Sequence, residues 1–289
     1  MRLGKWSMWT VAVGLLAMLA GSAAVADATR PFVWVRASDA LTLDPHAVNE
    51  GTTHALSHHI YEPLIIRDHA GQLVPALAVT WRQANNPLVW TFDLRPGVTF
   101  HDGTPLTARD VVFSIERARL PTSDLATRLK AISSIEAAGP DRIRIKTKIR
   151  DPLLPIQLTD IFRMSAAWAE ANSATAPLDY AAGEKGHAHV NANGTGPYKL
   201  AERRPGDVTR HVRYADYWGF AGKEAADIET PAAIDNRPVP DASERLAALQ
   251  SSAADFVQDV PANELARLRQ MPGVKLRIGP EHRVIFLGL

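Results

Sequence analysis

Alternating apolar and polar residues predict β-strands in the first half of the chain. In Val89–Leu94, tryptophan, phenylalanine and leucine alternate with threonine and aspartate, so the predicted strand has one apolar and one polar face. Apolar runs at 33–35 and 98–100 predict two more strands, the second returning after the turn residues 95–97. We expect Trp90, Phe92 and Phe100 to build the core rather than stack on a ligand.

Further strand patterns follow after residue 130. Residues 134–138 and 143–147 flank a Gly-Pro-Asp turn and predict a hairpin. Apolar runs at 274–278 and 284–287 predict terminal strands. Residues 221–240 are rich in alanine, proline and aspartate without a clean period, so we expect a loop or linker there.

Capping patterns predict where helices begin. Thr107 with Asp110 three residues later opens a helix that should end near Arg119. Asp241 and Glu244 repeat the pattern before a second apolar stripe.

A third helix should start at Pro261 and close at Gly273, since proline suits a first turn and glycine a C-terminus. Short strands and hairpins mixed with helices predict a mixed α/β (α+β) fold with a mixed sheet.

Composition narrows the function classes. The 289 residues are 46% hydrophobic and 22% charged, enough to bury a core of one large or two modest domains. Without residues 1–26, which hold Arg2 and Lys5 but no acid, 30 basic residues stand against 31 acidic ones, a balance that gives no support to nucleic-acid binding. The absence of cysteine excludes disulfides, thiolate metal sites, a cysteine nucleophile and a lipid-anchoring cysteine.

Residues 1–26 have the order of a secretory signal. A basic start precedes an apolar stretch at about 8–20 and small residues ending in Ala24-Val25-Ala26. The alternative is an N-terminal membrane anchor, because such a run can just span a bilayer. We expect cleavage before Asp27 and export to the periplasm.

Motifs for catalysis are missing from the sequence. It contains no G-x-S-x-G, H-E-x-x-H, G-x-x-x-x-G-K or G-x-G-x-x-G, so we expect no enzyme and no cofactor. His187 and His189, with His58 and His59, leave a metal site as an alternative to a polar loop and a helix-surface pair. We interpret His101-Asp102 as a structural turn.

A glycine-proline turn at 193–200 also stands out. Gly194 and Gly196 lie two residues apart, which indicates positive φ or a close backbone approach. Composition alone does not say whether a ligand needs this turn.

Several ordered blocks together resemble the family 5 extracellular solute-binding proteins of ABC importers, which bind peptides, oligopeptides or nickel. The blocks are Ile60-Tyr61-Glu62-Pro63-Leu64, Pro75-Ala76-Leu77-Ala78 with Trp81, the run 90–114, Gly194-Thr195-Gly196-Pro197-Tyr198, Asp216-Tyr217-Trp218-Gly219, the run 240–249 and the run 255–260.

The resemblance implies a periplasmic-binding-protein type II-like clamp that holds a solute between two lobes and docks on an ABC permease in the inner membrane. Domains are then expected at 1–26 (signal peptide), 27–270 (first lobe, with a subdomain at about 51–165) and 271–289 (start of the hinge crossing). Family members continue into a second lobe that this sequence lacks, so we expect a fragment, a truncated gene or half of a split protein.

Three functions follow from these expectations. The leading one is peptide capture for import, weakened by the missing lobe. Nickel or metal-complex binding is an alternative on the same fold, and docking of a separate second-lobe polypeptide is another. By the resemblance, the candidate ligand-binding residues are Leu43, Asp44, His46, His58, Tyr61, Gly194, Thr195 and Gly196. We expect Asp216, Tyr217 and Trp218 to serve structural packing.

Overall fold

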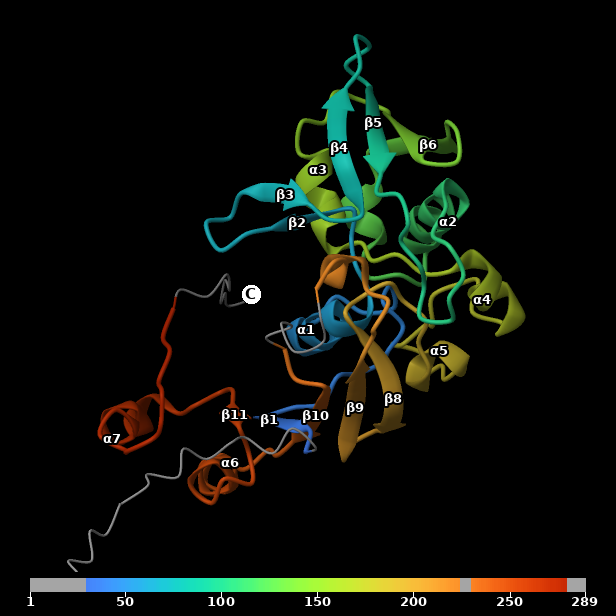
Figure 1. The fold of residues 1–289 in the computed structure, drawn as a ribbon. Helices are drawn as coiled ribbons and strands as arrows, with labels where there is room; N and C mark the ends of the chain where they lie inside the picture. Colours follow the sequence, from blue (N-terminus) through green and yellow to red (C-terminus); the bar gives the residue numbers. More distant parts are fainter. Residues whose placement is uncertain (1–29, 224–229, 280–289) are drawn as a thin grey trace, which may run out of the picture. The chain divides into compact units, whose positions relative to one another are not determined.

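Three sheets form the framework of the computed structural model, which describes residues 30–223 and 230–279 (Figure 1). The five-stranded sheet contains, in spatial order, β11 (Phe256–Val257), β1 (Phe32–Arg36), β10 (Ala233–Pro238), β9 (Val208–Arg213) and β8 (Tyr198–Arg204). The four-stranded sheet contains β4 (Ala78–Gln83), β5 (Val89–Leu94), β7 (Arg142–Thr147) and β6 (Ile132–Ala137). A small antiparallel pair joins β2 (Ile65–Arg67) and β3 (Leu73–Pro75).

The helices are short and connect these sheets. They are α1 (Gly51–Ile60), α2 (Ala108–Ala118), α3 (Leu154–Gln157), α4 (Ala166–Ala171), α5 (His187–Val190), α6 (Ala242–Gln250) and α7 (Leu265–Leu268). Helix α1 packs against β8, α2 against β6 and β7, and α6 against β11. None of the helices in the described ranges is long and apolar enough to cross a membrane.

Strand directions in the five-stranded sheet confirm the predicted mixed α/β fold. Strand β1 pairs in parallel with β10 and β11, whereas β9 is antiparallel to both β10 and β8. Therefore β11, β1, β10 and β8 all run in the same direction. Their carboxyl ends share one edge of the sheet, which we call the carboxyl edge.

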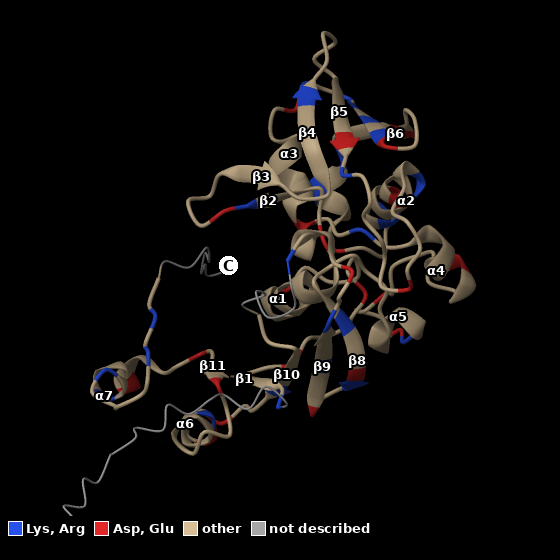
Figure 2. Ribbon diagram, in the orientation of Figure 1, with Lys and Arg blue, Asp and Glu red and all other residues tan. Residues whose placement is uncertain are grey.

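The main core lies between the four-stranded sheet and α2. Phe92 and Phe100 are fully buried in it, and Trp90 packs against it, as predicted. On the opposite face of β5, Asp93 pairs with Arg82 and Arg142. Figure 2 shows acidic and basic residues interspersed along the described elements.

Most predicted elements are confirmed. The hairpin of β6 and β7 forms, and β1 and β5 lie where the pattern places them. At the start of α2, the amide and the hydroxyl of Thr107 both donate to the Asp110 carboxylate, at 2.9 and 2.7 Å. Asp241 accepts from the amide of Glu244 at the start of α6.

Four predictions are wrong. The loop predicted at 221–240 contains β10, whose strand form comes from pairing on both sides rather than from its own sequence. Residues 98–100 make only a single bridge, because β4 and β7 already occupy both sides of β5. Residues 274–278 form no strand. After Pro261 the chain forms a 3₁₀ turn and the short α7, which ends well before Gly273.

Some expectations fall on residues that the structure does not describe. These are the signal peptide at 1–26, the strand at 284–287, and the last residues of the expected hinge crossing at 271–289.

Candidate functional site

The C-terminus of α1 meets the turn at 194–196 at very short range. The amide of Gly196 donates to the carbonyl of Ile60 at 2.8 Å. A Cβ on Gly194 would lie 2.0 Å from the Ile60 oxygen, and one on Gly196 would lie 2.7 Å from the His59 oxygen. Only glycine permits this approach. The glycine pair therefore locks a loop onto α1, which is the close backbone approach that the sequence indicated.

Beside this contact lies the buried carboxylate of Glu62. It accepts hydrogen bonds from the hydroxyls of Thr195 and Tyr217, both at 2.9 Å, and from Trp218 Nε1 at 3.0 and 3.1 Å. The guanidinium of Arg95 stacks 3.9 Å from the Trp218 ring centre, a favourable cation–π contact. Thr195 is thus buried against Glu62, whereas Tyr217 and Trp218 also line an open pocket of about 650 Å³ together with Arg95.

Glu62 should make the stability of this junction depend on pH. Burial raises the pKa of Glu62 to about 7 from an ordinary 4.5, although its hydrogen bonds oppose the rise. The folded state thus binds the proton more tightly, so this contribution to stability is complete below pH 4.5 and is lost as the pH rises through 7. We expect the free energy of unfolding of the wild type, relative to Glu62→Gln, to fall across that window.

Urea denaturation followed by tryptophan fluorescence at several pH values measures this difference. The difference should level off above pH 7, where Glu62 is ionised in both states. A difference that stays constant from pH 4.5 to 8 would contradict the raised pKa.

A second buried group ties the segment after β1 to α2. The Nη1 and Nη2 atoms of Arg117 donate to the two carboxylate oxygens of Asp44, at 2.7 and 2.6 Å, and both side chains are fully buried. Arg117 also donates to the carbonyls of Ala174 and Ala176 and to His46 Nδ1. All five guanidinium N–H groups therefore have acceptors.

This cluster shifts the titration of its acidic and imidazole groups. Burial opposes ionisation of Asp44, but the hydrogen bonds and charge of Arg117 outweigh it and hold the pKa of Asp44 below its usual range. Burial and the charge of Arg117 lower the pKa of His46 to about 3. His46 is therefore neutral at physiological pH. Because Nδ1 accepts from Arg117, its Nε2 donates to the carbonyl of Phe162 at 3.0 Å.

Most of the predicted ligand-binding residues are interior. Leu43, Asp44, His46, Tyr61 and Thr195 are at most 1% exposed, and burial raises the pKa of the Tyr61 hydroxyl. The expectation that they line a cleft therefore needs correction, because a solute cannot reach them directly. Any role they have in binding must come through the segments that they position.

Leu43 and Asp44 do hold such a segment. The amide of Leu43 donates to the carbonyl of His189 at 3.0 Å, and Asp44 accepts from the amide of Leu178 at 3.1 Å. Between these two contacts the chain runs over the surface from 178 to 189. The loop after β1 therefore fixes a second, exposed segment beside it.

His58 is the exposed member of the predicted set. Its ring packs edge-on against Phe162, with centroids 4.8 Å apart, on the outer face of α1. One turn earlier, His54 also contacts Phe162. Nearby, Arg128 joins Asp160 and Asn49 in a polar cluster, with Nη1 2.5 Å from Asp160 and Nη2 3.1 Å from Asn49.

The carboxyl edge of the five-stranded sheet lies next to the start of α1. The hydroxyls of Ser38 and Thr52 are 3.1 Å apart, and Arg36 Nη1 donates to the Thr52 carbonyl at 3.3 Å. Glu50 already accepts from the amides of Thr52 and Thr53 in the first turn of α1, so these two amides are not available to an external anion. In sheets with parallel strands, ligands bind outside the carboxyl ends.

An open groove of about 520 Å³ lies at this edge; we call it the edge groove. Its lining residues are Ser38, Asp39, Ala40, Leu41, Tyr180, Gly183, Glu184, Lys185, His189, Arg203 and Pro205. They come from the loop after β1, the end of β8 and the segment that Leu43 and Asp44 hold. The volume is within the range of small-molecule sites.

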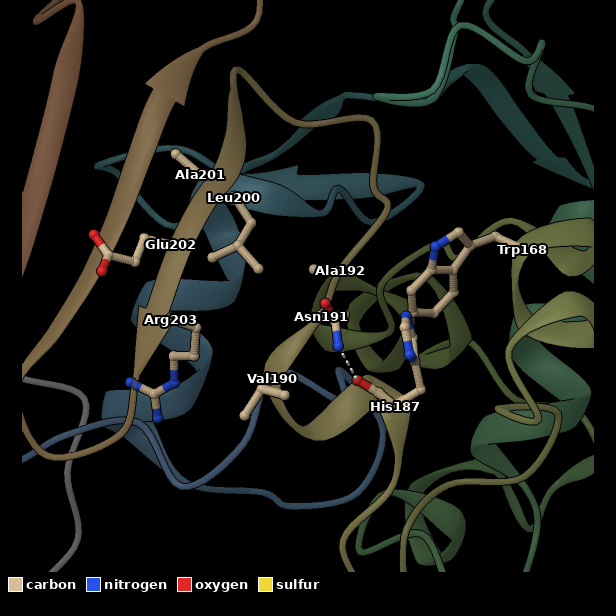
Figure 3. A pocket seen from close by; sticks show the side chains of 9 residues that line it. All are labelled: Trp168, His187, Val190, Asn191, Ala192, Leu200, Ala201, Glu202 and Arg203. Carbon is tan, nitrogen blue, oxygen red and sulfur yellow. Dashed lines mark hydrogen bonds between the residues drawn. The ribbon is translucent and has the colours of Figure 1, made fainter.

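A second groove, of about 360 Å³, shares Arg203 with the edge groove; we call it the Trp168 groove (Figure 3). Figure 3 shows the Trp168 and His187 rings at one wall and Leu200 on β8 opposite them. The centroids of the Trp168 and His187 rings lie 5.3 Å apart. Its lining residues are Trp168, His187, Val190, Asn191, Ala192, Leu200, Ala201, Glu202 and Arg203.

The structure separates the histidines that could have formed a metal site. His187 lines the Trp168 groove, whereas His189 lines the edge groove. His58 and His59 belong to α1. In the described part of the chain, no three or more His, Asp or Glu residues come together in a group that could hold a metal ion.

Sequence reasoning missed Arg203 and Lys185 as groove residues. Arg203 is held by Asp39, with Nη1 2.7 Å from Oδ1, although the two lie 164 positions apart. Its side chain is only 2% exposed. No local motif signals such a long-range pair, and Lys185 lies in a segment without periodicity.

Comparisons with known proteins assign the chain to a family. Residues 72–289, more than half of the chain, match the model of the bacterial extracellular solute-binding proteins, family 5. The glutathione-binding protein GsiB of Escherichia coli O1:K1 / APEC is 29% identical over 276 residues, covering 93% of this chain and 50% of GsiB. The chain thus spans about half the length of these curated relatives.

Solved structures agree on the fold. NikZ from Campylobacter jejuni in complex with Ni(L-His) superposes with a TM-score of 0.71 at 20% identity, over 83% of this chain and 45% of NikZ. The periplasmic binding protein DppA from Helicobacter pylori in complex with the peptide STSA gives a TM-score of 0.70 at 24% identity, over 84% of this chain and 49% of DppA. Both confirm the predicted fold type. The chain belongs to the family 5 bacterial extracellular solute-binding proteins.

Proposed function

We propose that this chain captures peptides in the periplasm for import by an ABC transporter, after export directed by residues 1–26. The observation that carries the proposal is the edge groove, an open site at the carboxyl ends of parallel strands in a chain of this family. The peptide-bound DppA structure and the glutathione-binding relative support a peptide as cargo. The proposed partners are the inner-membrane permease and a polypeptide equivalent to the relatives' other half.

Peptide rather than nickel is favoured by the side chains on the surface. In the described part of the chain, no three His, Asp or Glu residues form a group that could hold a metal ion, whereas the edge groove is lined by both polar and apolar residues. A wet groove that binds the backbone and termini of a peptide tolerates many side chains. We therefore propose sequence-tolerant peptide capture.

We expect the chain by itself to bind di- to hexapeptides weakly, with Kd values above about 1 μM. Because the chain spans half the length of its relatives, the solute gains contacts from one wall only. Those contacts must offset an association cost of about 4–15 kcal/mol. Isothermal titration of the full chain with mixed peptides, and in parallel with nickel chloride, measures this.

The outcomes separate the possibilities. Saturable heat with peptides and none with nickel supports the proposal. No peptide binding up to about 10 mM, equivalent to less than about 3 kcal/mol, overturns peptide capture by this chain. Sub-micromolar peptide binding overturns the one-wall argument instead.

A further inference from the structure

The chain that links β7 to α3 exposes three large apolar side chains. Ile149 is 68% exposed, Leu153 57% and Ile156 40%. Nine large apolar side chains are exposed in 30–223 and 230–279, so one third of them fall within the eight residues 149–156. Single exposed apolar residues are normal on a protein surface, whereas grouped ones indicate a contact surface. We call residues 148–156 the β7–α3 segment.

The backbone of the β7–α3 segment is held in place. Trp90 Nε1 donates to the carbonyl of Asp151 at 3.2 Å, and Oδ1 of Asp151 accepts from the amide of Leu153 at 3.0 Å. Leu154 is fully buried in the main core. The exposed side chains therefore do not belong to a loose loop, because an anchored backbone presents them at the surface.

Three cations accompany these apolar side chains. Lys148 and Arg150 belong to the segment, and the amide of Lys148 donates to the carbonyl of Ala131 at 2.7 Å, which brings Lys130 beside it. All three cationic side chains are exposed, and within 30–223 and 230–279 they make no ion pair or hydrogen bond. The one acid of the segment, Asp151, is only 8% exposed. The surface is therefore both apolar and positively charged.

This combination matches the surface of a bilayer that contains anionic lipids. There, apolar side chains enter the boundary between headgroups and acyl chains, while lysine and arginine pair with anionic headgroups. The three cations are not fixed by hydrogen bonds, and mobile headgroups need no preset donor positions, whereas a protein partner presents its carboxylates at fixed positions. No residue of 148–156 lines the edge groove or the Trp168 groove, so lipid contact here leaves both grooves open.

We propose that the β7–α3 segment binds the surface of a bilayer containing anionic phospholipids. The three cations pair with headgroup phosphates, and the three apolar side chains enter the boundary with the acyl chains. This inference goes beyond the proposed function and does not depend on which solute is captured, because it concerns a different surface. Its consequence is a chain that stays close to the membrane.

The experiment uses a dye that reports on this segment alone. Because the sequence contains no cysteine, Pro152→Cys, at an exposed position of the segment, gives the full chain one labelling site for an environment-sensitive fluorophore. Contacts that residues 1–26 make with lipid do not place this dye in the bilayer. Vesicles of phosphatidylglycerol and phosphatidylcholine in equal parts should give a saturable blue shift, and vesicles of phosphatidylcholine alone should give none.

Two labelled variants separate the charged from the apolar part of the contact. Lys148→Glu with Arg150→Glu should weaken the response to anionic vesicles about tenfold or more. Ile149→Ser with Leu153→Ser should weaken it by a similar factor. The four side chains are exposed, so both variants should fold, and circular dichroism checks this.

The matched control is Arg67→Glu with Lys275→Glu, which changes the net charge equally at two exposed cations outside the segment and should leave the response unchanged. An equal response to both kinds of vesicle, or a Lys148 and Arg150 variant that behaves like this control, would overturn the inference. A blue shift that appears without vesicles and grows with protein concentration would overturn it too, since it assigns the segment to a second copy of the chain. Peptide titration by calorimetry tests the proposed function separately, so either proposal can fail alone.

Discussion

Replacing Arg117 by methionine should lower the free energy of unfolding by about 3–5 kcal/mol, the usual cost of breaking a buried ion pair. The change leaves the carboxylate of Asp44 inside the protein without its cation. The carbonyls of Ala174 and Ala176 also lose their donor. Chemical denaturation followed by circular dichroism measures the loss.

The matched control is another ion pair of the same helix. Arg109 also lies on α2, and its Nη2 is 2.6 Å from Glu170, but the two side chains are 65% and 52% exposed. Arg109→Met should cost at most about 1 kcal/mol, because exposed pairs contribute little. Equal losses in the two variants would refute the assignment of Arg117 as an interior anchor.

The Arg117 variant should also affect solute binding. Asp44 holds the amide of Leu178, from which the chain runs on to Lys185 and His189 in the edge groove. Loss of this anchor loosens one wall of the groove. We expect weaker peptide binding even under conditions where Arg117→Met remains folded.

Gly194→Ala should destabilise the protein by about 3 kcal/mol or more, at the upper end of overpacking costs. The new methyl group would lie 2.0 Å from the carbonyl oxygen of Ile60, a backbone atom that cannot rotate away. The 194–196 turn would have to leave α1. This separation would disturb the hydrogen bond from Gly196 to Ile60 and the one from Thr195 to Glu62.

Gly51→Ala is the control for this substitution. Gly51 opens α1, and a Cβ there meets no atom within 4 Å. Alanine is the better helix former, so this variant should be neutral or slightly more stable in thermal unfolding. If Gly194→Ala unfolded at the same temperature as Gly51→Ala, the close approach of the turn to α1 would be disproved.

Local patterns in the sequence were enough to place many elements. The alternation in β5 and the capping residues of α2 and α6 act within a few positions of one another, so they can be recognised without knowing the fold. The close glycine pair at 194 and 196 likewise indicated a tight approach. The ordered blocks were sufficient to identify the family.

Pairing between distant segments decided the rest. Strand β10 exists because β1 and β9 accept it on both sides, although its own sequence resembles a loop. The single bridge at 98–100 has the converse cause, since β5 has no free side.

The candidate site shows the same division. From the sequence by itself, Leu43 and Asp44 could be selected as relevant, but not as interior residues that hold the wall of a groove. The edge groove itself joins residues near 40, 185 and 203. The charge pairing in the groove is visible only in the tertiary structure. Asp39 pairs with Arg203, and Lys185 makes no ion pair within the described ranges. Electrostatic interactions depend on distance in space, which sequence separation does not reveal.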